Sequence, residues 1–256
     1  RIVLDLVSFG GSVKGYFHIL SDVYPSQLVP TCGTSFASPY LLRMAAGIRA
    51  ILGDQVSILG IKSLLVHTAQ QNSQSSNEVG WGKVPSTLNE IIESKDGTVK
   101  IIYQGELLPG KFLNVPLPIP NDGIKGKIKI TATCCIASET DPQDTSMYTK
   151  AGITIKWMPK FGINPKATES FFKQQKFATE AELRNDAGKW ESVLHNSVSK
   201  IGSTLEEPAF ELHYSARNGG ANAGKEARPV RYAFVVSIEA PKSKTIFNDI
   251  LTEYEN

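Results

Sequence analysis

The sequence predicts an α/β segment followed by an antiparallel β domain, because the spacing of its apolar residues changes near residue 95. Before that point, residues 2–7 form a nearly continuous apolar run, which is typical of a buried strand in a parallel sheet. After it, apolar and polar residues alternate in short stretches. We therefore expect an α/β unit over residues 1–92 and a jelly-roll-like β-sandwich with a C-terminal helix over residues 93–256.

The first unit contains two segments with helical character. Residues 39–52 are rich in small and apolar side chains, which is typical of a helix buried all round, and residues 57–69 carry one apolar stripe at helical spacing. Residues 16–31 show no clean period and contain two prolines, so we expect a loop there.

The second unit contains strand patterns separated by glycine, proline, asparagine and aspartate turns. Alternation of this kind predicts sheets with one face toward solvent, and six or more strands in about 150 residues favour a β-sandwich. An amphipathic helix is expected over residues 243–254. The strand patterns lie at residues 99–101, 111–113, 127–130, 153–157, 210–214 and 232–238.

Composition excludes several function classes. The net charge is +2, from 27 basic and 25 acidic residues that are interspersed, so we expect no nucleic-acid binding. No apolar stretch approaches the ~20 residues of a membrane span, and we expect no membrane association. No metal-ligand spacing, phosphate loop or cofactor lysine stands out, so neither a metal nor a cofactor is expected.

The three cysteines argue against a disulfide framework. They are Cys32, Cys134 and Cys135, an odd number, which favours a reducing, cytoplasmic compartment. The adjacent pair lies in a strand pattern, so the two side chains are expected on opposite faces. Cys32 is interpreted as a small buried cysteine behind a packed turn rather than as a reactive thiol.

The most informative segment for function is Gly33-Thr34-Ser35-Phe36-Ala37-Ser38-Pro39. It places a serine between a glycine turn and a tightly packed helix. A nucleophilic hydroxyl must be held in a fixed direction, and a helix N-terminus turns backbone N–H groups toward a developing oxyanion. The alternative is structural, because serine and threonine are also preferred N-cap residues.

This segment resembles the serine motif G-T-S-x-A-x-P of subtilisin-like serine proteases, with Gly33, Thr34, Ser35, Ala37 and Pro39 at its fixed positions. Three further stretches are similar to elements of that family, in the family's order. They are residues 4–11, a strand with a Phe-Gly loop; residues 64–69, the end of a helix; and residues 80–85, a glycine-aromatic-glycine turn. Together they cover about a third of the chain. The resemblance implies a doubly wound parallel sheet in the first unit.

The resemblance further implies a serine endopeptidase in which Ser35 forms an acyl-enzyme with a peptide or protein substrate. The family's aspartate, histidine and oxyanion asparagine precede the serine, and the 34 residues before Ser35 contain none of their motifs. Asp5 lacks the family context, and none of the four histidines supplies the base. The chain therefore resembles the C-terminal portion of such a protease. We expect it to be completed by the N-terminal part of the same protease and to be inactive by itself.

Two alternatives stay open at this stage. Besides the protease fragment, the chain could be a pseudoprotease or a non-catalytic binding or regulatory module built on the β-sandwich. In every case one strand and two helices leave an apolar face uncovered. We therefore expect the N-terminal third to be paired with another polypeptide, rearranged or poorly ordered.

Overall fold

A computed structural model describes residues 5–140, 142–143, 148–172, 192–216 and 228–255. The chain divides into two compact units, Arg1–Glu93 and Ser94–Asn256. Both contain helices and strands, and the sheets are antiparallel. Among the described residues, no helix is both long and apolar enough to cross a membrane.

The first unit is built around α1 (Thr34–Leu52) and α2 (Ile58–Thr68), which confirm the two predicted helices. α2 begins where the Ser57 hydroxyl accepts a hydrogen bond from the Gly60 amide, so a side chain satisfies a free helix donor. A one-turn 3₁₀ helix (Gly53–Gln55), α3 (Ser76–Val79) and α4 (Leu88–Ile92) complete its helices. Its buried apolar residues are Met44, Ile48, Ile61, Leu64, Leu65, Val66, Val79, Val84 and Ile91.

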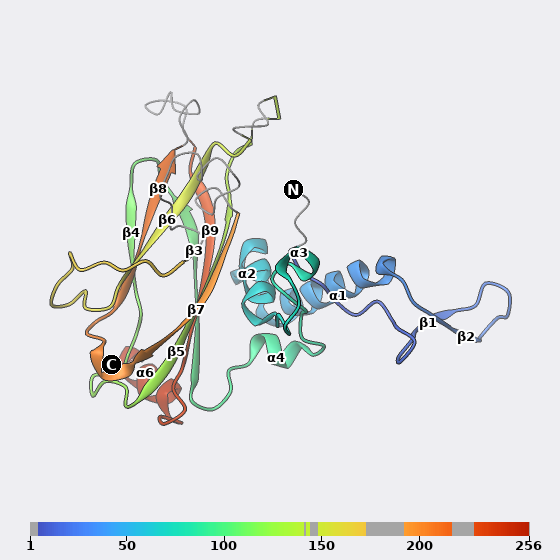
Figure 1. Cartoon of the computed structure of the whole chain (residues 1–256), viewed down its shortest axis with the longest axis horizontal. Coiled ribbons are helices and arrows are strands. Elements are labelled where there is room, and N and C mark those ends of the chain that lie inside the picture. Colours follow the sequence, from blue (N-terminus) through green and yellow to red (C-terminus); the bar gives the residue numbers. More distant parts are fainter. Residues whose placement is uncertain (1–4, 141, 144–147, 173–191, 217–227, 256) are drawn as a thin grey trace. The chain divides into compact units, whose positions relative to one another are not determined.

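A β-hairpin replaces the loop that was expected over residues 16–31. It consists of β1 (Phe17–Leu20) and β2 (Leu28–Thr31), paired antiparallel, and extends away from the helices of this unit (Figure 1). The expectation of a loop was wrong because proline is tolerated in a strand that has a neighbour on one side only. Pro30 lies in β2, whereas Pro25 lies in the connection between the strands.

The parallel sheet expected in the first unit is reduced to one bridge. Val7 forms a parallel bridge with Lys83. The Val7 amide donates a hydrogen bond to the Gly82 carbonyl at 3.0 Å, and the Val84 amide donates one to the Val7 carbonyl at 3.0 Å. No parallel strand ladder forms among residues 5–93, and residues 2–4 of the expected strand lie outside the described part. The expectation of a doubly wound sheet is corrected because one extended segment has no adjacent parallel strands to build on.

The described residues of the second unit form seven strands in two antiparallel sheets. The larger sheet has the order β3-β9-β5-β7 and the smaller one β4-β8-β6. Consecutive strands alternate between the sheets (Figure 1). The strands are β3 (Thr98–Leu107), β4 (Phe112–Pro116), β5 (Lys127–Ala137), β6 (Ala151–Met158), β7 (Val193–Ile201), β8 (Ala209–Ala216) and β9 (Val230–Glu239).

The predicted β pattern of this unit is largely confirmed. The six expected strands correspond to β3, β4, β5, β6, β8 and β9, and the expected C-terminal helix is α6 (Ile246–Glu255). β7 was not predicted. A short 3₁₀ helix (Gly202–Thr204) follows it.

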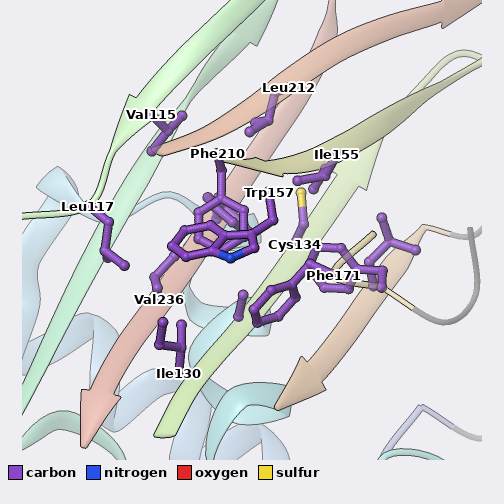
Figure 2. Close-up of a cluster of buried hydrophobic side chains, with 14 of the residues drawn as sticks. Val115, Leu117, Ile130, Cys134, Ile155, Trp157, Phe171, Phe210, Leu212 and Val236 are labelled. Atoms are coloured by element: carbon purple, nitrogen blue, oxygen red, sulfur yellow. The ribbon is translucent and has the colours of Figure 1, made fainter. Parts of the chain in front are cut away.

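Both sheets contribute to one hydrophobic core, which makes this unit a sandwich. Figure 2 shows Trp157 of β6 and Phe210 of β8 at its centre, with ring centroids 4.6 Å apart. Phe234 of β9, in the other sheet, lies 5.0 Å from Phe210. Nε1 of Trp157 is buried and has no hydrogen-bond partner among the described residues.

The paired cysteines of β5 lie as the strand pattern predicted. Cys134 belongs to the core between the sheets, and Cys135, although also buried, is outside that core. Because successive side chains of a strand alternate, the two thiols lie on opposite faces of the larger sheet. Neither forms a disulfide bond, and burial raises the pKa of Cys134 well above its usual value.

Candidate active site

Ser35 lies in the first turn of α1, and its side chain is exposed. Gly33, which has no side chain to cap the helix, occupies the N-cap position, and its carbonyl accepts a hydrogen bond from the Phe36 amide at 3.1 Å. The alternative in which Ser35 itself caps the helix is therefore wrong. The helix also begins at Thr34, five residues before the predicted start, so that the whole serine motif after Gly33 is helical.

Pro39 weakens the helix where Ser35 sits. A helical carbonyl normally accepts a hydrogen bond from the amide four residues later, and for Ser35 that residue is Pro39, which has no N–H. The carbonyl of Ser35 therefore receives no helical hydrogen bond from Pro39. Contacts with other segments must fix the position of this first turn.

One such segment is the extended stretch before β1. The Gly33 amide donates to the Gly10 carbonyl at 2.8 Å, and the Ser8 hydroxyl donates to the Ala37 carbonyl at 2.5 Å. Gly10 also approaches closely, since a Cβ atom there would lie 2.6 Å from the carbonyl oxygen of Gly33. The glycine of the predicted Phe-Gly loop thus brings two backbones together directly behind the serine turn.

A second set of contacts is a row of aromatic rings, which the sequence did not predict. The ring of Phe36 is stacked on Phe17 with centroids 5.2 Å apart and planes inclined by 18°. Phe17 is in turn stacked on Phe9 at 6.2 Å, and Phe9 meets the edge of Tyr40 at 6.4 Å. The Tyr40 hydroxyl donates to the Ser86 carbonyl. These four rings, Phe36, Phe17, Phe9 and Tyr40, are called the aromatic row.

Gly10→Ala is expected to disturb the serine turn. The added methyl group would lie 2.6 Å from the Gly33 oxygen, and overpacking of this kind costs about 1–3 kcal/mol. We expect faster hydrogen exchange at the amides of residues 33–37 and a lower urea midpoint for the first unit. Gly15→Ala is the matched control, because a Cβ atom there meets nothing within 4 Å. Equal exchange in both variants would contradict the packing role of Gly10.

The candidate partners of Ser35 lie elsewhere. Asp5 forms an ion pair with Lys62 of α2, with Oδ2 and Nζ 2.8 Å apart. His18 is exposed in β1 opposite Pro30, and His67 is buried near the end of α2. The other two histidines belong to the second unit. Within the described residues, no hydrogen bond joins the Ser35 side chain to a histidine or a carboxylate.

The thiol nearest in sequence to the candidate nucleophile is exposed. Cys32 precedes the serine by three residues and was expected to be buried behind the turn. That expectation was wrong because the stretch from Cys32 to Ser35 lies on the surface of the unit. The backbone of Gly11 does approach it, since a Cβ atom there would lie 3.0 Å from the Cα of Cys32.

Among the residues of the second unit that the structure describes, two further clusters contain titratable side chains. Thr133 Oγ1 and His195 Nδ1 lie 2.7 Å apart, and burial, assisted by the positive charge of Lys129, lowers the pKa of His195 to about 4. On the other sheet, Glu211 accepts hydrogen bonds from His213 at 2.5 Å and Lys156 at 3.2 Å. Burial acts to raise the pKa of Glu211, but these hydrogen bonds outweigh it and the pKa lies below its usual value.

Comparisons with known proteins identify no family. No protein-family model matches the chain, and no curated protein matches it. Among solved structures, the chain is similar to the infectious bursal disease virus VP2 subviral particle, with 8% identity, a TM-score of 0.34 and coverage of 60% of this chain and 36% of that chain.

A second solved structure is similar over a comparable part of the chain. It is PliG of Aeromonas hydrophila, a periplasmic inhibitor of g-type lysozyme, with 12% identity, a TM-score of 0.25 and coverage of 57% of this chain and 92% of that one. Of the viral chain described above, this chain spans only 36% of the length, about a third. At these TM-scores neither similarity enters the functional argument.

Proposed function

We propose that the chain is the C-terminal part of a subtilisin-like serine endopeptidase, with Ser35 as the nucleophile. The observation that carries this proposal is the exposed hydroxyl in the first turn of α1, directly behind a glycine turn. The residues of the serine motif lie together there, and the Phe9–Gly10 segment, which resembles the family's upstream loop, packs against them.

The proposed chemistry is acyl transfer. Ser35 Oγ attacks the carbonyl carbon of a peptide bond while a histidine accepts its proton, and an aspartate fixes the tautomer of that histidine. Free backbone N–H groups of the first turn of α1, with an asparagine side chain, stabilise the oxyanion. The histidine then protonates the leaving amine, and water hydrolyses the acyl-enzyme. The histidine, aspartate and asparagine come from the N-terminal part of the same protease.

The β1–β2 hairpin supports the need for that N-terminal part. Leu20, Val23 and Leu28 are 73%, 68% and 62% exposed. Exposed large apolar side chains gathered on one short hairpin are typical of a surface that another polypeptide covers. An isolated two-stranded hairpin is also only marginally stable in water.

The second unit is proposed to be a jelly-roll-like accessory domain. Its strands alternate between two antiparallel sheets, and its core is formed by its own residues. A domain with a self-contained core is suited to brace the catalytic domain or to hold a protein partner.

Labelling with a serine-directed fluorophosphonate tests the nucleophile. The full-length protein that contains this chain is expected to form a covalent adduct at Ser35, and Ser35→Ala is expected to reduce labelling to background because the attacking oxygen is gone. Ser38→Ala is the matched control, since Ser38 is exposed on the same helix and occupies a variable position of the motif. Its labelling rate should equal that of the wild type.

Two results would count against the endopeptidase. Adduct formation at a residue other than Ser35 would leave the proposed nucleophile without support. Complete absence of labelling in the folded full-length protein would favour the alternatives, a pseudoprotease or a non-catalytic binding module built on the sandwich.

A further inference from the structure

The position of Ser35 depends on contacts outside its own helix. Pro39 cannot donate a hydrogen bond to the carbonyl of Ser35, and Gly33 offers no side chain to cap the helix. The first turn of α1 is therefore less constrained by its own backbone than an ordinary first turn. Any residue that fixes this turn from outside also fixes the backbone position from which the Ser35 hydroxyl projects.

Phe36 is the side chain through which such a contact is made. It follows Ser35 directly in the chain, so the two Cα atoms are joined by one rigid peptide unit. The Phe36 ring is nearly parallel to the ring of Phe17, at 18° and 5.2 Å between centroids. A movement of the first turn would therefore disrupt this stack.

Phe17 is itself held on its other side. It stacks on Phe9 at 6.2 Å, and Phe9 directly precedes Gly10, whose carbonyl accepts a hydrogen bond from the Gly33 amide. These contacts form a closed path. Ring stacking leads from Phe36, next to Ser35, across Phe17 to Phe9. The chain then leads to Gly10, whose hydrogen bond returns the path to Gly33. Phe17 is the one member of this path that comes from the β1–β2 hairpin.

We infer that Phe17 is a positioning residue for Ser35, and that it transmits the position of the β1–β2 hairpin to the candidate nucleophile. This inference rests on the proposed function insofar as it concerns reactivity. The Phe17 ring also orders the first turn of α1, whether or not Ser35 is reactive. Since Phe17 begins β1, a polypeptide that covers the hairpin would also fix the ring against Phe36.

The test uses Phe17→Ala in the full-length protein with two measurements. The first is hydrogen exchange at the amides of residues 34–37, which we expect to become faster when the stack is lost. The second is the rate of fluorophosphonate labelling as a function of probe concentration. We expect the maximal labelling rate to fall about 10- to 100-fold, as for a misplaced reacting group, with little change in the concentration for half-maximal rate.

Two further variants separate positioning from general destabilisation. Phe17→Tyr keeps the ring and is expected to restore both the amide protection and most of the labelling rate. Tyr16→Ala removes the neighbouring aromatic side chain, which is 43% exposed and precedes β1, and is expected to leave both measurements unchanged.

The outcomes distinguish this inference from the proposed function. Unchanged exchange at residues 34–37 in Phe17→Ala would overturn the inference, whatever the labelling shows. Faster exchange with an unchanged labelling rate would overturn the transmission to Ser35 while leaving the endopeptidase intact. If the wild type does not label at all, the proposed function fails, and the exchange experiment alone decides whether Phe17 orders the turn.

Discussion

Replacing Phe210 by alanine is expected to lower the free energy of unfolding of the sandwich by about 3–5 kcal/mol. Phe210 is fully buried, and its ring lies 4.6 Å from Trp157, 5.1 Å from Phe171 and 5.0 Å from Phe234. Its removal leaves a cavity between the two sheets that rigid aromatic neighbours cannot fill. Urea denaturation followed by circular dichroism and tryptophan emission would measure the loss.

Phe112→Ala is the matched control for this prediction. Phe112 is 59% exposed in β4 and is stacked on His213 at the surface of the smaller sheet. We expect a loss of about 1 kcal/mol or less, because little apolar area leaves water when this ring folds against the sheet. Equal losses for the two variants would show that the centre of the sandwich is not formed as described.

Acidification is expected to destabilise the sandwich through His195. Its pKa is about 4 in the folded unit, where burial disfavours the charged ring, against 6.5 for the free side chain. The unfolded chain therefore binds a proton between these values while the folded unit does not, and stability falls as pH decreases from about 6.5 to 4. At 1.36 kcal/mol per pKa unit, the loss is about 3 kcal/mol.

His195→Gln isolates this contribution from that of the carboxylates. Glutamine can still hydrogen-bond to Thr133 but does not titrate, so the variant is expected to lose much less stability between pH 6.5 and 4 than the wild type. His18→Gln, in the first unit, should keep the full slope of the sandwich. A slope unchanged in His195→Gln would mean that other groups cause the acid sensitivity.

The sandwich was largely predictable because most of its strands alternate in a simple way. β7 was the exception, and its residues show why. Ser197 and His195 pair with Thr131 and Thr133 of β5, so the side of the larger sheet away from the core carries hydrogen-bonded polar side chains where β7 lies. A strand whose partly buried positions are polar gives no apolar period, and sequence patterning cannot find it.

The candidate site was predictable in part, because the serine motif is local in sequence. The aromatic row was not predictable, since Phe9, Phe17 and Phe36 belong to three separate segments and meet only after the hairpin has formed. The hairpin itself was predicted as a loop because its segment contains Pro25 and Pro30. The parallel sheet was overpredicted because the apolar run at residues 2–7 indicates a buried strand but does not supply its neighbours.

The position of β9 has a consequence for how the sandwich is made in the cell. The last strand of the unit lies between the first strand, β3, and β5, and it pairs with both along most of their length. During synthesis the backbone of β3 therefore cannot form its hydrogen bonds within the larger sheet until residues 230–239 have left the ribosome. Contacts so distant in sequence slow folding and leave the edges of unpaired strands exposed to aggregation. We therefore expect the nascent chain to be most prone to aggregation before β9 pairs with β3 and β5.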